Sequence, residues 1–233
     1  MIIANNVSKQ FGKLKALDNV SVQCNKGECI ALIGPNGSGK TTLIKSILGM
    51  VVPDSGFITF NGNNILHHWQ YRTHIGYMPQ IGRYPDNMSI GQVLEMMKDI
   101  RSTSTQLDED LIKRFDLEHM LHKRMRTLSG GTRQKVSASL AFLFNPDVLI
   151  LDEPTAGLDP VASEILKEKI IEEKKKGKLV MITSHILSEL DDLVTHIIYM
   201  QDGKLRFHQS IDELRKHTGE EKLSKAIANV MTK

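Results

Sequence analysis

The stretch from 28 to 50 reads ECIALIGPNGSGKTTLIKSILGM and constrains the fold of this chain more than any other. Its apolar run CIALIG is typical of a buried strand, and the apolar residues of KTTLIKSIL recur at helical spacing, with Gly49 behind them as a stop. Between the two lies GPNGSGKT, which satisfies the pattern G-x-x-x-x-G-K-[ST]. A strand, a glycine loop and a helix in this order predict a phosphate-binding loop.

The predicted loop carries suitable chemistry for a nucleotide. Glycines let backbone N–H groups approach a phosphate, and the following helix aims the positive end of its dipole at the same place. Lys40 can reach the β and γ phosphates, and the Thr41 hydroxyl can ligate Mg²⁺. The alternative is an ordinary glycine turn before a helix. The predicted nucleotide-binding residues of the loop are Gly34, Pro35, Asn36, Gly37, Ser38, Gly39, Lys40, Thr41 and Thr42.

The composition is that of a folded globular chain. Of its 233 residues, 40% are hydrophobic and 24% are charged, which suits one large domain or a core with a subdomain. The formal net charge of +3 is too small to imply nucleic acid as a partner. Cys24 and Cys29 indicate neither a zinc site nor a disulfide framework, and we expect Cys29 to be a reduced core residue.

Nothing in the sequence predicts a segment that enters a membrane. The first residues, MIIANNVSKQFGK, lack the pattern of a secretory signal. A membrane-spanning helix needs about 20 mostly apolar residues, and runs such as VLIL are far shorter. If the protein acts on a membrane, we expect another chain to cross it.

The spacing of apolar residues changes twice along the chain. Short strands separated by turns give way to helical spacing in SIGQVLEMMKDI, in LDEDLIKRFDLEHMLH at 107–122 and after LSGG. Strands return with DVLILDEP, KLVMITSH and HIIYMQDGKL, and the first two are apolar runs typical of strands buried on both faces. We therefore predict an α/β fold with a core from 1–80 and 146–211, a helical subdomain over 81–145 and a helical tail over 212–233.

VLILDEP at 148–154 delivers two carboxylates, Asp152 and Glu153, at the end of a buried strand. Adjacent strand residues point to opposite faces, so we expect two different roles. Asp152 suits an outer-sphere hold on Mg²⁺, and Glu153 suits positioning or deprotonating a water molecule. Alone, such an acidic pair is as often the start of a helix. The helix that follows is predicted to be capped by Asp159, to begin at Pro160 and to end before Gly177.

These motifs occur in a recognisable order. GPNGSGKT, the glutamine of YMPQ, LSGG, LILDEP, AGLD at 156–159 and the histidine of ITSH resemble, over essentially residues 1–210, the ATPase subunit of ABC transporters. The resemblance implies a phosphate-loop NTPase core with an N-terminal antiparallel β region and an inserted α-helical subdomain. It also implies ATP and Mg²⁺ as cofactors.

The resemblance explains why LSGGTRQKV at 128–136 forms a second glycine-rich run before a helix. In the family, the signature of one subunit caps the nucleotide held by the phosphate loop of another, so two chains close head to tail around two ATP molecules. Ser129, Gly130 and Gly131 are therefore implied to contact the γ-phosphate on a partner chain. Thr132 stands where the family usually has Gln, at a position not assigned to phosphate, so we expect activity to be retained.

The resemblance also assigns roles to four single residues. Gln80 would ligate Mg²⁺ or the water and relay occupancy to the helical subdomain, and His185 would contact the γ-phosphate and support the attacking water. Asp159 would bridge the two sites of the dimer, and Phe11 would stack on adenine. Each role has an alternative. Gln80 could be a plain glutamine at a strand end, and His185 a polar residue after a strand. Asp159 could be only a helix cap, and Phe11 a core aromatic. The implied catalytic residues are Glu153, His185, Gln80 and Lys40, and the implied metal ligands are Thr41, Gln80 and Asp152, the last through water.

The implied partners are a transmembrane permease and a second copy of the chain, or a similar chain. The protein would lie on the cytoplasmic face and meet the membrane only through the permease. One rival is an ABC ATPase that acts on ribosomes or DNA, which usually has two ATPase units in one chain or a long coiled coil. Another is a GTPase or small-molecule kinase, but NKGE at 25–28 precedes the phosphate loop and lacks the aspartate of a guanine-recognition motif.

The transported substrate has only an indirect signal. IGYMPQIGRYPDNMSIGQVLEMM and LSGGTRQKV resemble exporter-like ABC ATPases and, more weakly, the ATPase subunit of the transporter that matures the copper site of nitrous oxide reductase. An ATPase subunit rarely contacts what is moved, so export of a drug or polysaccharide is the alternative, and neighbouring genes would decide. Stacking does not decide between ATP and GTP, because an aromatic face accepts any base.

Overall fold

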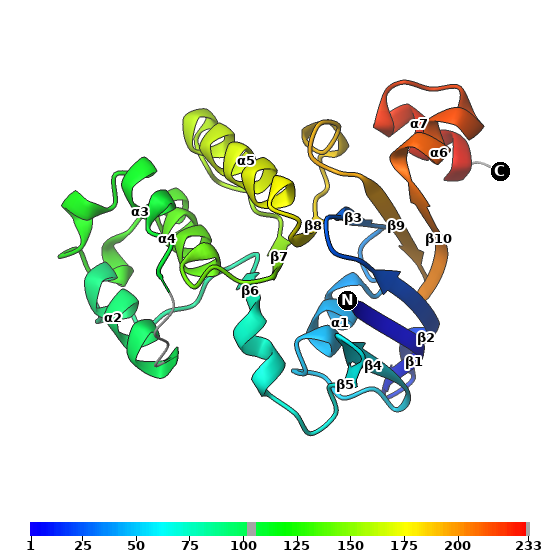
Figure 1. The fold of residues 1–233 in the computed structure, drawn as a ribbon, viewed down its shortest axis with the longest axis horizontal. Helices are drawn as coiled ribbons and strands as arrows, with labels where there is room; N and C mark the ends of the chain where they lie inside the picture. The colour runs from blue at the N-terminus through cyan, green and yellow to red at the C-terminus, as the bar shows by residue number, and fades with distance from the viewer. Residues whose placement is uncertain (102–105, 232–233) are drawn as a thin grey trace. The chain divides into compact units, whose positions relative to one another are not determined.

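The computed structural model describes residues 1–101 and 106–231 and divides into two compact units (Figure 1). The first unit comprises Met1–Arg72 and Lys174–Lys233, and the second comprises Thr73–Glu173. The predicted helical subdomain, 81–145, falls within the second unit, and its boundaries stay a prediction. Within the described ranges, no helix combines the length and apolar character needed to span a bilayer.

An antiparallel sheet occupies the beginning of the first unit. It contains β1 (Ile2–Phe11), β2 (Leu14–Cys24), β4 (Ser55–Phe60) and β5 (Asn63–Asn64), in the order β2-β1-β4-β5. Alternate residues such as Val20, Val22 and Cys24 of β2 are buried, because successive strand residues face opposite sides of the sheet. The expected N-terminal antiparallel region and the α/β class are thereby confirmed.

The remaining strands of this unit are three parallel strands and one antiparallel strand. β3 (Cys29–Ile33) pairs in parallel with β8 (Leu179–Thr183) on one side and β9 (His196–Gln201) on the other, and β10 (Lys204–Ser210) pairs antiparallel with β9. Every residue of β3 and β8 is buried, as their apolar runs predict. α1 (Lys40–Ile47) follows β3, so the predicted order of strand, loop and helix is confirmed.

Both cysteines lie in this unit as free, buried thiols, and burial raises the pKa of each to about 12. The expectation of a reduced core residue at Cys29 is confirmed. The segment after residue 211 forms α6 (Ile211–Thr218) and α7 (Leu223–Met231), which lie side by side (Figure 1). A capping box between Ser210 and Glu213 begins α6.

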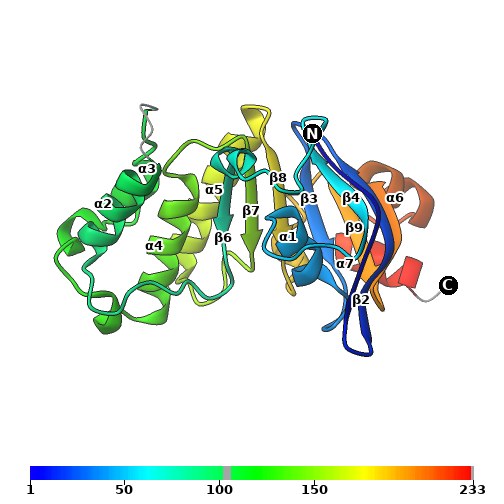
Figure 2. The same ribbon diagram turned by 90° about the horizontal axis from the view of Figure 1, so that it is seen from below.

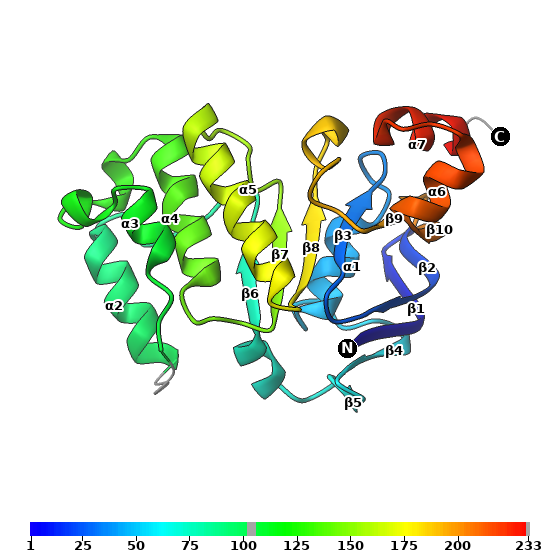
Figure 3. The same cartoon turned by 45° about the horizontal axis from the view of Figure 1, so that its top comes forward.

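The second unit combines two parallel strands with helices. β6 (Ile75–Met78) pairs with β7 (Val148–Asp152), and α4 (Gly130–Phe142) lies beside β6 (Figure 2). α2 (Ile90–Arg101), α3 (Asp110–Arg114) and α5 (Pro160–Lys175) complete the unit, and α3, α4 and α5 lie next to one another (Figure 3). Short 3-10 helices cover Glu118–Met120 and Met125–Thr127 in this unit, Leu187–Glu189 in the first unit, and Gln70–His74 at the boundary of the two.

One predicted helix is wrong in its extent. The helical run over 107–122 is broken after the five residues of α3, because Asp116 adopts a left-handed backbone with φ of 55°. The chain resumes only as a 3-10 turn at Glu118–Met120. By contrast, α5 has the predicted ends, since Asp159 Oδ1 accepts from the Ala162 N–H at 2.8 Å and Gly177 follows with φ of 80°.

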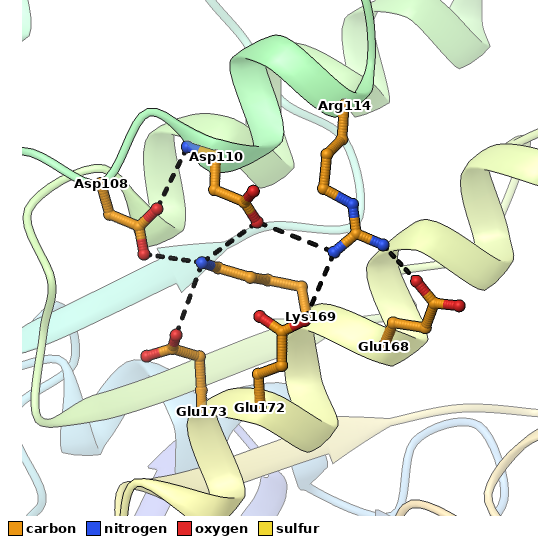
Figure 4. Close-up of polar contacts among 7 residues, drawn as sticks. All are labelled: Asp108, Asp110, Arg114, Glu168, Lys169, Glu172 and Glu173. Atoms are coloured by element: carbon orange, nitrogen blue, oxygen red, sulfur yellow. Dashed lines mark hydrogen bonds and ion pairs between the residues drawn. The ribbon is translucent and has the colours of Figure 1, made fainter.

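A buried cluster of charges joins α5 to the beginning of α3 (Figure 4). The Nζ of Lys169 lies 2.8 Å from Asp108 Oδ2, 3.3 Å from Asp110 Oδ2 and 3.5 Å from Glu173 Oε1. The side chain of Lys169 is 3% exposed and that of Glu173 is 0% exposed. Burial lowers the pKa of Lys169, but the three carboxylates outweigh it and hold the pKa above its ordinary value.

Arg114 adds a second cation at the edge of this cluster. Its guanidinium lies 3.7 Å from Asp110 Oδ2 and 3.6 Å from Glu172 Oε1, and it donates to Glu168 (Figure 4). Because three of the carboxylates belong to α5 and the arginine to α3, the cluster fixes the packing of the two helices.

Replacing Lys169 with Met is expected to lower the free energy of unfolding by about 3–5 kcal/mol, because the carboxylates of Asp108 and Glu173 lose their buried cation. Urea denaturation of the purified chain measures the loss. The matched control is Lys167→Met on the same helix, since Lys167 pairs with Glu164 at 2.8 Å but both are more exposed, at 23% and 67%. That pair is worth about 0–1 kcal/mol. Equal losses in the two variants would contradict the role of the buried cluster.

Candidate functional site

The glycine loop of the first unit is held against neighbouring backbone. Gly39 directly precedes α1 with φ of 101°, a conformation that side chains strongly disfavour. A Cβ on Gly39 would meet the backbone oxygen of Ala16, and a Cβ on Gly34 would meet that of Met200. Glycine is therefore required at both positions by close approach as well as by backbone angle.

Lys40 folds back over this loop. Its Nζ donates to the backbone oxygens of Gly34 at 2.7 Å and Pro35 at 3.0 Å, and lies 3.5 Å from Ser38 Oγ. The first hydrogen bond inside α1 runs from the Leu43 N–H to the Gly39 oxygen at 2.9 Å. Hydrogen bonds inside a helix begin only after its first turn, and the N–H groups of such a turn can bind an anion.

Two other predicted residues of the first unit lie near strand ends. His185 follows β8 and is exposed, and the glycine loop follows β3, so both come after the carboxyl ends of adjacent parallel strands. Phe11 ends β1 and is 48% exposed, with the Lys9 Nζ 5.5 Å from its ring centroid. Phe11 is therefore a surface residue and not the core aromatic that was its alternative.

The second unit also has candidate residues at the carboxyl ends of two adjacent parallel strands. Gln80 follows β6 and is exposed, and Asp152 is the last residue of β7, so both lie at the carboxyl ends of a parallel pair. Burial, followed by the negative charge of Asp152, raises the pKa of Tyr77 on β6. The carboxylate of Asp152 is thus close enough to influence the neighbouring strand.

Glu153 does not continue the strand, so the expected alternation of faces is wrong at this residue. β7 ends at Asp152, and Glu153 has a left-handed backbone with φ of 50°. Its direction is set by this turn and not by the pleat of the sheet. Its backbone oxygen accepts from the Ala156 N–H at 3.1 Å and from Gln134 Nε2 at 3.4 Å.

The signature residues form the beginning of α4. Ser129 is the N-cap, and its hydroxyl oxygen accepts from the Thr132 N–H at 3.2 Å. Thr132, the departure from the usual signature, also bonds through its own hydroxyl to Ser129 Oγ at 2.9 Å, so the threonine supports the cap. Ser129 and Gly130 are exposed, and the N-terminus of α4 is presented on the surface.

Asp159 acts as a helix cap and as an ion-pair partner. Besides capping α5, it accepts at Oδ2 from the Lys135 Nζ at 2.8 Å. The hydrogen bond from Lys135, followed by that from the Ala162 N–H, lowers the pKa of the Asp159 carboxyl. The structure thus bears out the capping alternative, and the bridging role of Asp159 in a dimer stays a prediction.

The predicted residues fall into one set in each unit. Phe11, the glycine loop and His185 belong to the first, and Gln80, the signature, Asp152, Glu153 and Asp159 belong to the second. Sequence reasoning assigned no role to Gln134 and Lys135, although both lie in LSGGTRQKV, the run that contains the signature. Their contacts with Glu153 and Asp159 join residues 19 and 24 positions apart, which no local pattern indicates.

A cavity of about 290 Å³ also lies in the first unit, away from these residues. Its lining includes Phe57 of β4 and the segment from His67 to Trp69, and the Trp69 side chain is 62% exposed. Ser46 and Gly49 at the far end of α1 are its lining residues nearest in sequence to the glycine loop. The cavity is therefore not the phosphate site.

Comparisons with known proteins point to one family. Residues 17–156, more than half of the chain, match the family model described as ABC transporter. The Nod factor export ATP-binding protein I of Burkholderia lata is 32% identical over 204 residues, covering 85% of this chain and 67% of that protein. An uncharacterised ABC transporter ATP-binding protein of Bacillus subtilis, YhaQ, is 30% identical over 228 residues, covering 96% of this chain and 76% of that protein.

Solved structures give the same result for the fold. The structure of an ATP-binding subunit of an ABC transporter superposes with a TM-score of 0.91 at 28% identity, covering 99% of both chains. A dimeric, post-hydrolysis cassette bound to ADP and Pi, MJ0796, has a TM-score of 0.81 at 23% identity, covering 91% of this chain and 99% of that one. Because its identity is only 23%, the likeness to the dimeric cassette shows the fold alone.

Replacing Gly39 with Ala is expected to destabilise the chain more than replacing Gly37 with Ala. Both residues have positive φ, 101° and 80°, so each alanine is strained by about 1–2 kcal/mol. At Gly39 the new Cβ would also displace the backbone oxygen of Ala16, which adds about 1–3 kcal/mol. At Gly37 no atom of the described residues lies within 4 Å of the new Cβ. Urea denaturation without nucleotide measures both, and equal losses would show that the close approach costs nothing.

Proposed function

Because the chain belongs to the ABC transporter family of ATP-binding proteins and is an ATPase, we propose that it energises a separate transmembrane permease by closing, as a head-to-tail dimer, around two ATP molecules. The observation that carries the proposal is the glycine loop, where Lys40 and the N-terminal turn of α1 lie together behind a buried strand. That arrangement is built to hold nucleotide phosphates.

The proposed chemistry is positioning and charge stabilisation. Lys40 and the loop N–H groups bind the phosphates, and Glu153 orients or deprotonates the attacking water. His185 and Gln80 support that water, and Phe11 stacks on the adenine with its exposed ring. Mg²⁺ would neutralise charge on the phosphates. Thr41, Gln80 and Asp152 fit this ion because they offer only oxygen ligands, with Asp152 acting through water.

The proposed partner of the signature is a second copy of this chain or a similar chain. The exposed N-terminus of α4 supports this, since Ser129, Gly130 and Gly131 can present N–H groups to a phosphate that another chain holds. The similar fold of a cassette described as a dimer bound to ADP and Pi also supports it. In this proposal Asp159 bridges the two sites, and the complex lies on the cytoplasmic face, bound to the permease and without nucleic acid.

For the transported substrate, the names of the relatives support a direction of transport but no chemical class. One relative is named for Nod factor export, which favours an exporter. The name of the other, an uncharacterised ABC transporter protein, gives no direction of transport. The more specific hypothesis of copper-site maturation for nitrous oxide reductase gains no support from these names. An ABC ATPase that acts on ribosomes or DNA remains the rival, and co-purification with either one and not with a permease would favour it.

Replacing Glu153 with Gln is expected to lower the rate of ATP hydrolysis at least about 100-fold, because the amide cannot act as a general base. ATP binding is retained, so the variant should form a dimer when Mg-ATP is added. The oligomeric mass of the purified variant with and without Mg-ATP, measured beside the hydrolysis rate of both proteins, checks this prediction.

The matched control for this experiment is Glu164→Gln, which neutralises an exposed carboxylate of α5 and should leave both readouts unchanged. If Glu153→Gln hydrolyses ATP at the rate of the parent chain, the assignment of Glu153 is wrong. If it binds ATP and stays monomeric at high protein concentration, the assignment of the signature to a partner's nucleotide has to be abandoned.

A further inference from the structure

Gln134 is a buried polar residue with a partner at the candidate site. It lies on α4, two positions beyond Thr132, and is 6% exposed. Its Nε2 donates to the backbone oxygen of Glu153 at 3.4 Å. A buried amide costs free energy unless it is hydrogen-bonded, so this contact fixes Gln134 as well as Glu153.

Lys135, the next residue on α4, reaches the other end of the same segment. Its Nζ lies 2.8 Å from Asp159 Oδ2, and its side chain is 23% exposed. Asp159 is at the same time the N-cap of α5 through its other carboxylate oxygen. Lys135 therefore connects α4 to the residue at which α5 begins.

A third contact lies between these two. A Cβ on Gly131 would come within 2.7 Å of the backbone oxygen of Gly157, so the first turn of α4 touches the segment backbone to backbone. Residues 131–135 thus contact the segment from Glu153 to Asp159 at its beginning, its middle and its end. All of these residues belong to the second unit.

The segment needs such support because of Glu153. A glutamate with φ of 50° is strained, and such a residue keeps its conformation only where its surroundings hold it. The two hydrogen bonds to its backbone oxygen, from Ala156 and Gln134, restrain the peptide plane that follows this strained residue. Since the Cα–Cβ direction of Glu153 depends on that backbone, the support from α4 also sets the direction in which its side chain leaves the chain.

We propose that Gln134 and Lys135 are positioning residues for ATP hydrolysis: Gln134 holds the backbone of Glu153 and Lys135 holds Asp159, so that the carboxylate of Glu153 meets the attacking water. This inference rests on the proposed role of Glu153. It assigns a second task to the helix of the signature, because the turn that faces the partner's nucleotide also orders the water-activating residue of its own chain.

The test compares the steady-state hydrolysis of Mg-ATP by the purified chain and its variants. Gln134→Met keeps the length of the side chain but removes the donor, and kcat should fall about 2- to 10-fold with KM unchanged. Lys135→Met should lower kcat about 2- to 5-fold, and Lys135→Arg, which keeps the charge, should restore it. A residue that only stabilises the fold would not give this split between kcat and KM or this rescue.

The matched control is Lys167→Met, because Lys167 has the same 23% exposure and a 2.8 Å ion pair, but its partner Glu164 lies on the same helix, α5. Its kcat should equal that of the parent chain. ATP-induced dimerisation of each variant, in the Glu153→Gln background, shows that the chain is folded and binds ATP. If Gln134→Met does not fold, Lys135→Met and its arginine rescue decide the question.

The outcomes separate this inference from the proposed function. If Glu153→Gln loses hydrolysis but both methionine variants keep the parent kcat, the positioning role is wrong and the function of Glu153 stands. If Lys135→Arg is as slow as Lys135→Met, the ion pair with Asp159 is not what matters. If Glu153→Gln itself hydrolyses ATP normally, the proposed function fails first.

Discussion

The burial of short parallel strands on both faces is the constraint on which the candidate site depends. Every residue of β3 and β8 is buried, and all but the last residue of β7 are buried. Such strands are apolar except at their last residues, so the charged and polar side chains gather at the carboxyl ends of the strands and in the loops that follow. The glycine loop, His185 and Gln80 follow the carboxyl ends of parallel strands, and Asp152 is the last residue of one.

Much of the fold and of the site could be predicted from sequence because the signals are local. The glycine loop, the strand before it and the helix after it lie within about two dozen residues, and apolar runs identify β7 and β8. Two predictions were wrong, the extent of the helix over 107–122 and the alternation of faces at Glu153, and each depends on a single backbone angle. The left-handed conformations of Asp116 and Glu153 break a helix and a strand pattern. Aspartate tolerates such an angle, whereas glutamate adopts it only where its surroundings impose it.

The contacts made by α4 could not be predicted for a different reason. Gln134 and Lys135 look like ordinary polar residues of a helix, and their partners become visible only when α4 packs against the segment after β7. The helix α4 therefore presents polar groups to two different places. Ser129 and Gly130 at its N-terminus are exposed, whereas Gln134 and Lys135 in its second turn contact the segment after β7.

The buried cluster around Lys169 has a consequence for how the chain folds. The pair of Lys169 with Asp108 joins residues 61 positions apart, and α5 cannot bury Lys169 favourably until the segment before α3 has arrived. Closing a loop of that length costs entropy before the contact forms. Contacts between residues far apart in the sequence slow folding for this reason. We therefore expect the Lys169 ammonium group to leave water late in folding, once Asp108 and Asp110 are in place to accept it.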